Sequence, residues 1–321
     1  MKFTPLKFQG TLAAAGVALM PYIFLKNTIF KSEGEISLSK LSLLSGSPLE
    51  YATAFFLTAV MGLFILIHLT LTAIFLKELF IWLLQPNDFK ELTENPLTNS
   101  AIFSPLISLP LTMVVLFGPV SFFLPQLTEN MQHFMLPAFL VFSFLWAIAI
   151  SLEIKAVKVF FTKPVELEKL NFGWLLDVLA LGAVSLFGSS LADFAHNNFI
   201  SSSAAFMVMV TLLVGIAVFL VKITVLFYQQ IKAKVMPGIN ILPAYFLIVP
   251  PMCLLGFSFY KLLGYASKTY GFDTNAISFL IIVFSYLTAM SWFIFSIILL
   301  REYLEKEFLS SDFSPAQWGM V

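Results

Sequence analysis

Charged side chains are scarce in this chain of 321 residues, because Asp, Glu, Lys and Arg make up only 11% of it. A soluble domain carries about 25% charged residues, and hydrophobic residues here reach 59%. Acidic and basic residues balance at 18 each, which leaves no net charge and no basic field to hold polyanions. These shortages exclude a soluble enzyme, a nucleic-acid-binding protein and a disordered chain.

Cysteine and histidine are also nearly absent. The one cysteine, Cys253, cannot form an intrachain disulfide, and with three histidines no Cys/His metal cluster can be built. The sequence lacks a P-loop, a nucleophile elbow, a HExxH zinc motif and a Rossmann glycine fingerprint. We therefore expect no catalytic residues, no metal site and no cofactor.

Long apolar blocks are what the chain has instead. A helix needs about 20 mostly apolar residues to cross a bilayer, and eight such blocks are separated by segments that hold nearly all the charges. We predict an all-α polytopic membrane protein, with one transmembrane domain over residues 1–321. The predicted spans are residues 9–25, 51–76, 101–124, 134–154, 173–192, 204–227, 241–263 and 276–300. The first is interpreted as a retained helix, with a cleaved signal peptide as the alternative.

Lysine and arginine are distributed unevenly between the two sides that these spans define. Thirteen of the 18 lie on the side of the N-terminus and five on the opposite side. Because cytoplasmic loops are enriched in Lys and Arg, this asymmetry predicts a cytoplasmic N-terminus in the plasma membrane, or in the inner membrane of a bacterium. The residues on the opposite side are Lys26, Lys31, Lys40, Lys261 and Lys268.

Helix-breaking residues are concentrated in the odd-numbered spans, as shown by Pro21, Pro110, Gly182 and Pro250. Backbone groups freed by such residues are tolerated in a membrane only where protein or a water-filled cavity satisfies them. We therefore predict inner odd-numbered spans, and outer even-numbered spans that are long and contain no internal proline. The third, fifth and seventh spans begin about 70 residues apart, which indicates tandem helical hairpins.

Small polar residues recur at helical spacing on two of the predicted inner spans. Ser108 and Thr112 do so in the third span, and Ser185 and Ser189 in the fifth. The pattern favours a polar path, although the same spacing also serves close helix packing. Kinked helices can bind a small anion through half-helix ends without a buried Lys or Arg. The pore-lining candidates are Gly16, Pro21, Ser108, Pro110, Thr112, Gly182, Ser185, Ser189, Pro250 and Pro251.

Two ionisable residues within the spans are candidates for proton coupling, because ionisable side chains inside a membrane are commonly functional. His68 lies in the middle of the second span and Asp177 near the start of the fifth. The structural alternatives are a hydrogen bond for His68, and an interfacial cap or ion pair near Lys169 for Asp177.

Two segments resemble the tellurite-resistance/dicarboxylate transporter (TDT) family, to which TehA-like and slow anion channel (SLAC1)-like proteins belong. One runs from Phe89 through Pro96 to Ile107, and the other from Phe313 to Trp318. The resemblance implies ten helices in five hairpins around a central pore, often in homotrimers. Residues 308–321 would then begin a ninth span, and the chain would end before the last two helices. The family's pore-plugging phenylalanine would lie at or beyond Val321.

The resemblance and the residue pattern together favour transport of a small anion, such as chloride, nitrate, sulfite or a dicarboxylate, through a path lined by the odd-numbered spans. The expected partners are this anion and the lipid bilayer, and no nucleic acid. One alternative is a proton-coupled exporter of sulfite or a C4-dicarboxylate, in which His68 or Asp177 titrates. From another class, the chain could be a membrane subunit that transports nothing, or an intramembrane transferase with Asp177, His68 and Lys222 around one pocket.

Overall fold

Long apolar helices form the eight candidate membrane spans of the computed structural model, which describes residues 3–31, 36–42, 47–234, 238–308, 310 and 315–320. Within these ranges there is no strand. The predicted all-α polytopic membrane fold is therefore confirmed. The candidate spans are Pro5–Ile29, Pro48–Leu83, Asn99–Phe123, Met131–Thr162, Phe172–Phe194, Asn198–Ala233, Ile241–Tyr270 and Asn275–Leu299.

One main α-helix builds each span. In order, these helices are α1 (Phe8–Phe24), α3 (Pro48–Leu83), α5 (Ser104–Val115), α8 (Met131–Thr162), α9 (Leu176–Phe194), α10 (Asn198–Ala233), α11 (Val249–Tyr270) and α12 (Asn275–Leu299). Short helices connect or follow them, namely α2 (Leu38–Leu41), α4 (Pro86–Glu94), α6 (Ser121–Phe123), α7 (Gln126–Glu129) and α13 (Arg301–Lys306).

The odd-numbered spans share a further feature, since each begins with a 3₁₀ segment that continues into its α-helix. These segments are η1 (Pro5–Lys7), η3 (Asn99–Phe103), η6 (Phe172–Leu175) and η7 (Ile239–Ile248). Two other 3₁₀ turns are η5 (Leu167–Lys169) and η8 (Pro315–Met320). A five-residue π-helical turn follows α1 as η2 (Leu25–Ile29) and α5 as η4 (Leu116–Val120). The recurrence of the 3₁₀ start agrees with the tandem-hairpin interpretation.

Local signals explain where several long helices begin and end. Pro48 occupies the first turn of α3, and Ser47 and Glu50 form a capping box that satisfies backbone N–H groups at its start. The Asn197 side chain accepts from two backbone N–H groups at the start of α10. Gly271 ends α11 in the left-handed conformation, at φ 70°, where glycine lacks the steric penalty of a Cβ.

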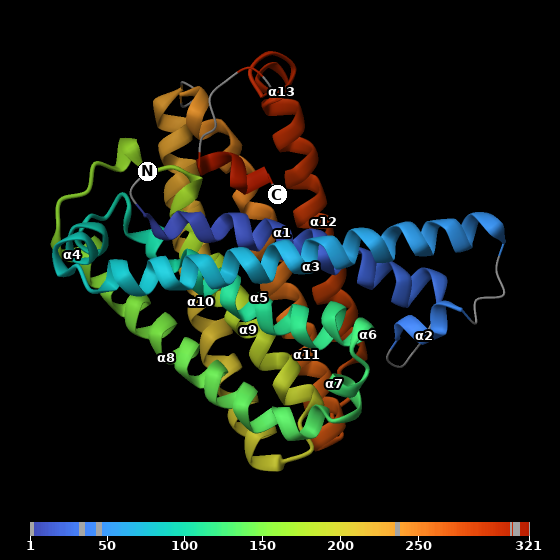
Figure 1. Ribbon diagram of the computed structural model, residues 1–321. Coiled ribbons are helices and arrows are strands. Elements are labelled where there is room, and N and C mark those ends of the chain that lie inside the picture. Colours follow the sequence, from blue (N-terminus) through green and yellow to red (C-terminus); the bar gives the residue numbers. More distant parts are fainter. Residues whose placement is uncertain are drawn as a thin grey trace.

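Burial separates the odd-numbered spans from the even-numbered ones. In their most apolar windows, 50%, 50%, 94% and 50% of the residues of the odd spans are buried, against 22%, 28%, 39% and 17% for the even spans. Figure 1 shows α9 and α11 in the middle of the molecule, with α8 along one side. We therefore call α1, α5, α9 and α11 the inner helices, and α3, α8, α10 and α12 the outer helices. This division agrees with the pattern of helix breakers.

Two expectations about helix breakers need correction. The even-numbered spans are not free of proline, because Pro137 lies inside α8, in its second turn. Pro137 is the seventh residue of the helix and lacks the N–H that would bond the His133 carbonyl, yet α8 continues to Thr162. Conversely, Gly182 and Gly188 leave α9 unbroken over 19 residues. Side chains of neighbouring helices pack closely against both glycines, Leu254 of α11 against Gly182 and Phe142 of α8 against Gly188.

The inner helices pack in sequence, α1 on α5, α5 on α9 and α9 on α11. Outer helices cover them, most extensively α3 on α1, α10 on α9 and α12 on α11. Two hydrophobic clusters result, a large one around α9 and a smaller one where α1, α3 and α5 meet. Leu12 and Leu254 pack against both clusters, so they lie where the inner helices converge.

Candidate functional site

A cavity of about 190 Å³ lies at the end of the bundle where the inner helices begin. We call it the N-side cavity. All four inner spans contribute to it, each through its first turns, and so does Ala316 of η8. Helix N-termini carry partial positive charge, so this arrangement favours a negative ligand. The lining residues are Leu6, Gln9, Leu97, Thr98, Ser100, Ala101, Asn171, Gly173, Leu176, Ala244, Leu247 and Ala316.

A second cavity, of about 150 Å³, lies at the opposite end of the inner helices, and we call it the C-side cavity. Two lysines line it, Lys26 from the turn after α1 and Lys261 from α11. The Lys261 ammonium donates to Ser190 Oγ at 3.2 Å and lies 5.1 Å from the centre of the Phe194 ring. Helix C-termini are electronegative, and these lysines bring positive charge to that end of the inner helices.

Apolar residues of the inner helices lie between the linings of the two cavities. Leu176 of α9 lines the first and Ser190 the second, which places them about 21 Å apart at 1.5 Å per residue. Between them, Leu186 is 8% exposed and packs in the cluster formed with α1, α3 and α5. Leu12 and Leu254 approach from α1 and α11. Along their helices, these leucines of α1, α9 and α11 lie between the residues that line the two cavities.

A line of hydrogen bonds joins α1 to α5 beside this axis. Gln9 Nε2 donates to Ser104 Oγ at 3.0 Å, and one turn further the hydroxyls of Thr11 and Ser108 are hydrogen-bonded. The residues are buried, and none of them carries a charge. Polar side chains that bond across helices satisfy groups that hydrocarbon could not solvate. Ser108 is therefore bound to α1 in this structure.

His68 extends these hydrogen bonds to the outer helix α3. Its ring is fully buried, and Nδ1 donates to the Thr11 carbonyl at 2.8 Å. Nε2 lies 3.0 Å from the Thr112 hydroxyl. Because Nδ1 must donate to a carbonyl, Nε2 of a neutral ring can only accept the proton of the Thr112 hydroxyl, for which the Ser108 carbonyl at 3.1 Å competes. A protonated ring would instead donate to the Thr112 oxygen. The expected structural hydrogen bond of His68 is present, and it ties α3 to both α1 and α5.

The other pore-lining candidates occupy different environments. A Cβ added at Gly16 would meet no atom within 4 Å, so this residue faces open space. Ser185 is fully buried, with no hydrogen-bond partner for its hydroxyl among the described residues, while Ser189 donates to the Leu186 carbonyl. Pro21 and Pro110 lie buried inside α1 and α5, and Pro250 and Pro251 form the first turn of α11. Whether these residues line a path remains a prediction.

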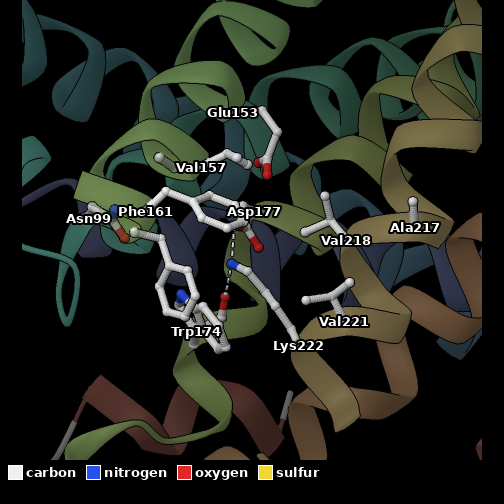
Figure 2. Close-up of a pocket in the computed structure, with 12 residues that line it drawn as sticks. Asn99, Glu153, Val157, Phe161, Trp174, Asp177, Ala217, Val218, Val221 and Lys222 are labelled. Carbon is white, nitrogen blue, oxygen red and sulfur yellow. Dashed lines mark hydrogen bonds and ion pairs between the residues drawn. The ribbon is translucent and has the colours of Figure 1, made fainter. Parts of the chain in front are cut away.

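Asp177 lies away from His68, in a group formed by α8, α9 and α10. Its carboxylate forms a buried ion pair with Lys222 of α10 and accepts from the Val178 N–H at 2.7 Å. The lysine also donates to the Trp174 carbonyl at 2.8 Å. Lys169, near which a partner for Asp177 was expected, instead pairs with Glu166 at 2.8 Å. Figure 2 shows Glu153 of α8 beside this pair.

Sequence reasoning overlooked several of these residues. In the sequence, three of them look like ordinary charged residues at the ends of spans, namely Glu153, Lys26 and Lys261. Two others look like isolated polar residues in an apolar block, namely Gln9 and Thr11. Gln9 could have been found, since a glutamine in a membrane helix needs a partner. The shared cavity of Lys26 and Lys261 could not have been found, because these two residues lie 235 positions apart in the sequence. The position expected for the pore-plugging phenylalanine, Val321 and beyond, lies outside the described residues.

A larger groove lies between the inner helix α11 and two outer helices. It has a volume of about 1140 Å³ between α10, α11 and α12, and its lining is almost wholly apolar. Among its polar residues, Ser285 donates to the Met252 carbonyl at 2.6 Å. A groove of this composition between helices of a membrane protein is suited to lipid tails, and we assign it no part in the path.

Comparison with known proteins yields one family. Residues 2–321 match the model of the SLAC1 family, which is described as voltage-dependent anion channel. No curated protein and no solved structure matches the chain.

Proposed function

We infer the function of this protein from its family as well as its geometry. The chain belongs to the SLAC1 family of voltage-dependent anion channels, whose model covers nearly its whole length. Together with the eight apolar candidate spans, this makes it an integral membrane protein of anion transport. We propose that small anions pass along the axis of the four inner helices, between the N-side and C-side cavities.

The placement of the two cavities is the observation that carries this proposal. Each lies at one end of the same four helices, and each offers positive potential by a different means. Helix N-termini supply it on one side, and Lys26 and Lys261 on the other. A path of this kind holds an anion weakly at both ends, as conduction requires, because tight binding would stop flow.

Leu12, Leu186 and Leu254 form the constriction of the proposed path. Apolar side chains that meet on the axis of a pore block a hydrated anion by size and by excluding water. The π-helical turns after α1 and α5 give these two helices adjustable ends. In this proposal the leucines separate when the inner helices shift.

Flux measurements test the proposal directly. The purified protein is reconstituted into liposomes, and the flux of chloride, nitrate, sulfite and malate is recorded against protein-free liposomes. We expect flux of at least one of these anions and none of potassium. Absence of flux for every anion, under both directions of applied voltage, would overturn the proposal and favour a membrane subunit that transports nothing.

Proton coupling is a second candidate, and the position of His68 favours it. The ring joins the outer helix α3 to α1 and α5, so a change in its protonation would alter hydrogen bonds to two inner helices at once. In this case anion flux follows an imposed pH gradient in the wild type, and His68→Ala abolishes that dependence. Equal responses of the two proteins to the gradient would exclude this role.

We also propose that the N-side cavity faces the cytoplasm, on the basis of the asymmetry of Lys and Arg. The test uses a Cys253→Ser background with one new cysteine, either at Glu166 or at Glu129. Both positions are exposed, and they lie on opposite sides. A membrane-impermeant maleimide applied to intact cells should label the cysteine at 129 and spare that at 166. The reverse pattern would invert the orientation.

A further inference from the structure

A third cavity lies off the proposed path, between the outer helices α8 and α10. Its volume is about 240 Å³, which is room for roughly eight water-sized groups. The floor carries the charged residues Glu153, Asp177 and Lys222, from three different helices. Figure 2 shows that the Glu153 carboxyl group points towards Asp177. The Lys222 ammonium donates hydrogen bonds to the Asp177 carboxylate and the Trp174 carbonyl.

The floor of this cavity holds two carboxyl groups but only one ammonium group. Asp177 is neutralised by Lys222, and the lysine also contacts the carbonyl and ring of Trp174. Glu153 is 3% exposed, and its Oε2 has no hydrogen-bond partner among the described residues. A buried carboxylate oxygen without a donor is costly. A ligand that brings one positive charge and hydrogen-bond donors would satisfy it.

The residues at the mouth of the cavity determine which kind of ligand can enter it. Val157 and Phe161 of α8 and Ala217 and Val221 of α10 line it, and all four are exposed on the outer surface of the bundle. A hydrated inorganic cation would have to cross this apolar rim. The described residues also contain no group of three or more His, Cys, Asp or Glu side chains that could hold a metal ion. The rim therefore favours a ligand with an apolar body that enters from the bilayer.

The walls fit an organic ammonium group. Phe160 and Phe161 line the cavity, and the Phe160 ring lies 5.0 Å from that of Trp174 between centroids. Aromatic faces attract alkylammonium groups, and a carboxylate gives them a charge-assisted hydrogen bond. We propose that this cavity binds the primary ammonium group of an amphiphile, with Glu153 as its acceptor and Phe160 and Phe161 around its first methylene groups.

Thermal unfolding in the presence of decylamine tests the proposal. At neutral pH the amine is protonated, and decanol provides a neutral ligand of the same length. In neutral detergent, decylamine should raise the melting temperature of the wild type more than decanol does. Glu153→Gln should weaken this binding about tenfold or more, whereas the exposed control Glu129→Gln should not. Equal shifts in the wild type and Glu153→Gln, or no shift in the wild type, would overturn the proposal.

A second variant covers the case in which Glu153→Gln fails to fold. Val221→Trp narrows the mouth and leaves Glu153 in place, so it should also remove the decylamine shift. An undiminished shift in Val221→Trp would overturn the proposal as well.

Nanodiscs distinguish the two sources of the ammonium group. If phosphatidylethanolamine stabilises the wild type over Glu153→Gln, relative to phosphatidylcholine alone, the ligand is a lipid headgroup. If only decylamine discriminates between the two proteins, the ligand is a free hydrophobic amine.

Discussion

The buried pair of Asp177 and Lys222 shows how strongly a single residue can constrain a membrane protein. Both side chains are at least nine-tenths buried, and each relies on the other to offset the loss of water. Replacing one partner leaves an uncompensated charge in a low-dielectric site, whereas replacing both need not be costly.

We predict that Lys222→Met destabilises the protein by about 3–5 kcal/mol, because Asp177 is then buried without its partner. The double variant Asp177→Leu with Lys222→Met should recover a large part of this loss. Thermal or denaturant unfolding in detergent measures both effects. Destabilisation of the double variant equal to the sum of the two single ones would show that the pair is not coupled.

The two lysines of the C-side cavity carry a second prediction at this scale. Lys26→Gln with Lys261→Gln should lower anion flux on the order of tenfold at low ionic strength, because the cavity then loses its attraction for anions. Screening should shrink the difference in 1 M salt. Lys268→Gln, which removes an exposed lysine paired with Asp193, serves as the control and should leave flux unchanged.

At the scale of the helix, glycines of the inner helices differ in what surrounds them. A Cβ at Gly188 would lie 2.4 Å from the Phe142 ring and 2.6 Å from Val208, so α9 approaches α8 and α10 only because no side chain intervenes. Gly16 of α1 has no such neighbour. The two residues read alike in the sequence and have opposite consequences in the structure.

We predict that Gly188→Ala destabilises the protein by about 1–3 kcal/mol, as overpacking of a buried interface does. The matched variant Gly16→Ala should be neutral, or stabilising by up to about 1 kcal/mol through helix propensity. Unfolding of the two variants side by side checks this. A loss of stability in Gly16→Ala as large as that in Gly188→Ala would contradict the packing argument.

Helix α4 is held to the end of α8 by an ion pair, which makes its docking pH-dependent. Lys163 donates to Glu94 at 2.8 Å, and this hydrogen bond lowers the pKa of the Glu94 carboxyl below its ordinary value. A carboxyl whose pKa is lower in the folded state stabilises that state above its unfolded pKa. The contribution is lost as the pH falls through the folded pKa.

We therefore predict that α4 loosens on acidification below about pH 4. Trp82 fluorescence reports this change, because its ring lies 6.0 Å from that of Phe89 in α4. Glu94→Gln should reduce the acid-induced change, whereas Glu91→Gln, at an exposed position, should not. Identical acid titrations of the wild type and Glu94→Gln would rule out this linkage.

Considered as a whole, the molecule consists of more deeply buried inner helices and of outer helices that expose many apolar side chains. Leu12 and Leu254 link the two hydrophobic clusters, so a change at either alters the interior rather than one interface. The homotrimer implied by the family resemblance remains a prediction, which the mass of the solubilised complex can test.

We predict that Leu254→Ala raises anion flux severalfold, because it widens the proposed constriction and allows water to enter. Leu63→Ala removes the same atoms from an exposed position on α3 and should leave flux unchanged. Liposome flux at matched protein amounts makes the comparison. Unaltered flux in Leu254→Ala would place the constriction elsewhere.

Some of this organisation follows from the sequence alone. Apolar blocks long enough to span a bilayer determine the helices, because hydrocarbon leaves the backbone no other partner than itself. Proline and glycine in alternate blocks identify the inner helices for the same reason. Pro137 shows the limit of this reasoning, since it lies inside the outer helix α8 and therefore does not mark an inner one.

Only the tertiary structure decided which side chains meet. Thr11 and Ser108 lie 97 residues apart, and Asp177 and Lys222 lie 45 apart, on different helices. Whether two such residues meet depends on the depth and rotation of each helix, and packing against neighbours sets both. The sequence determined that this chain spans a membrane and that its inner helices carry most of the proline and glycine. Packing decided that Glu153 is left without a donor beside an ion pair, and that Lys26 and Lys261 share one cavity.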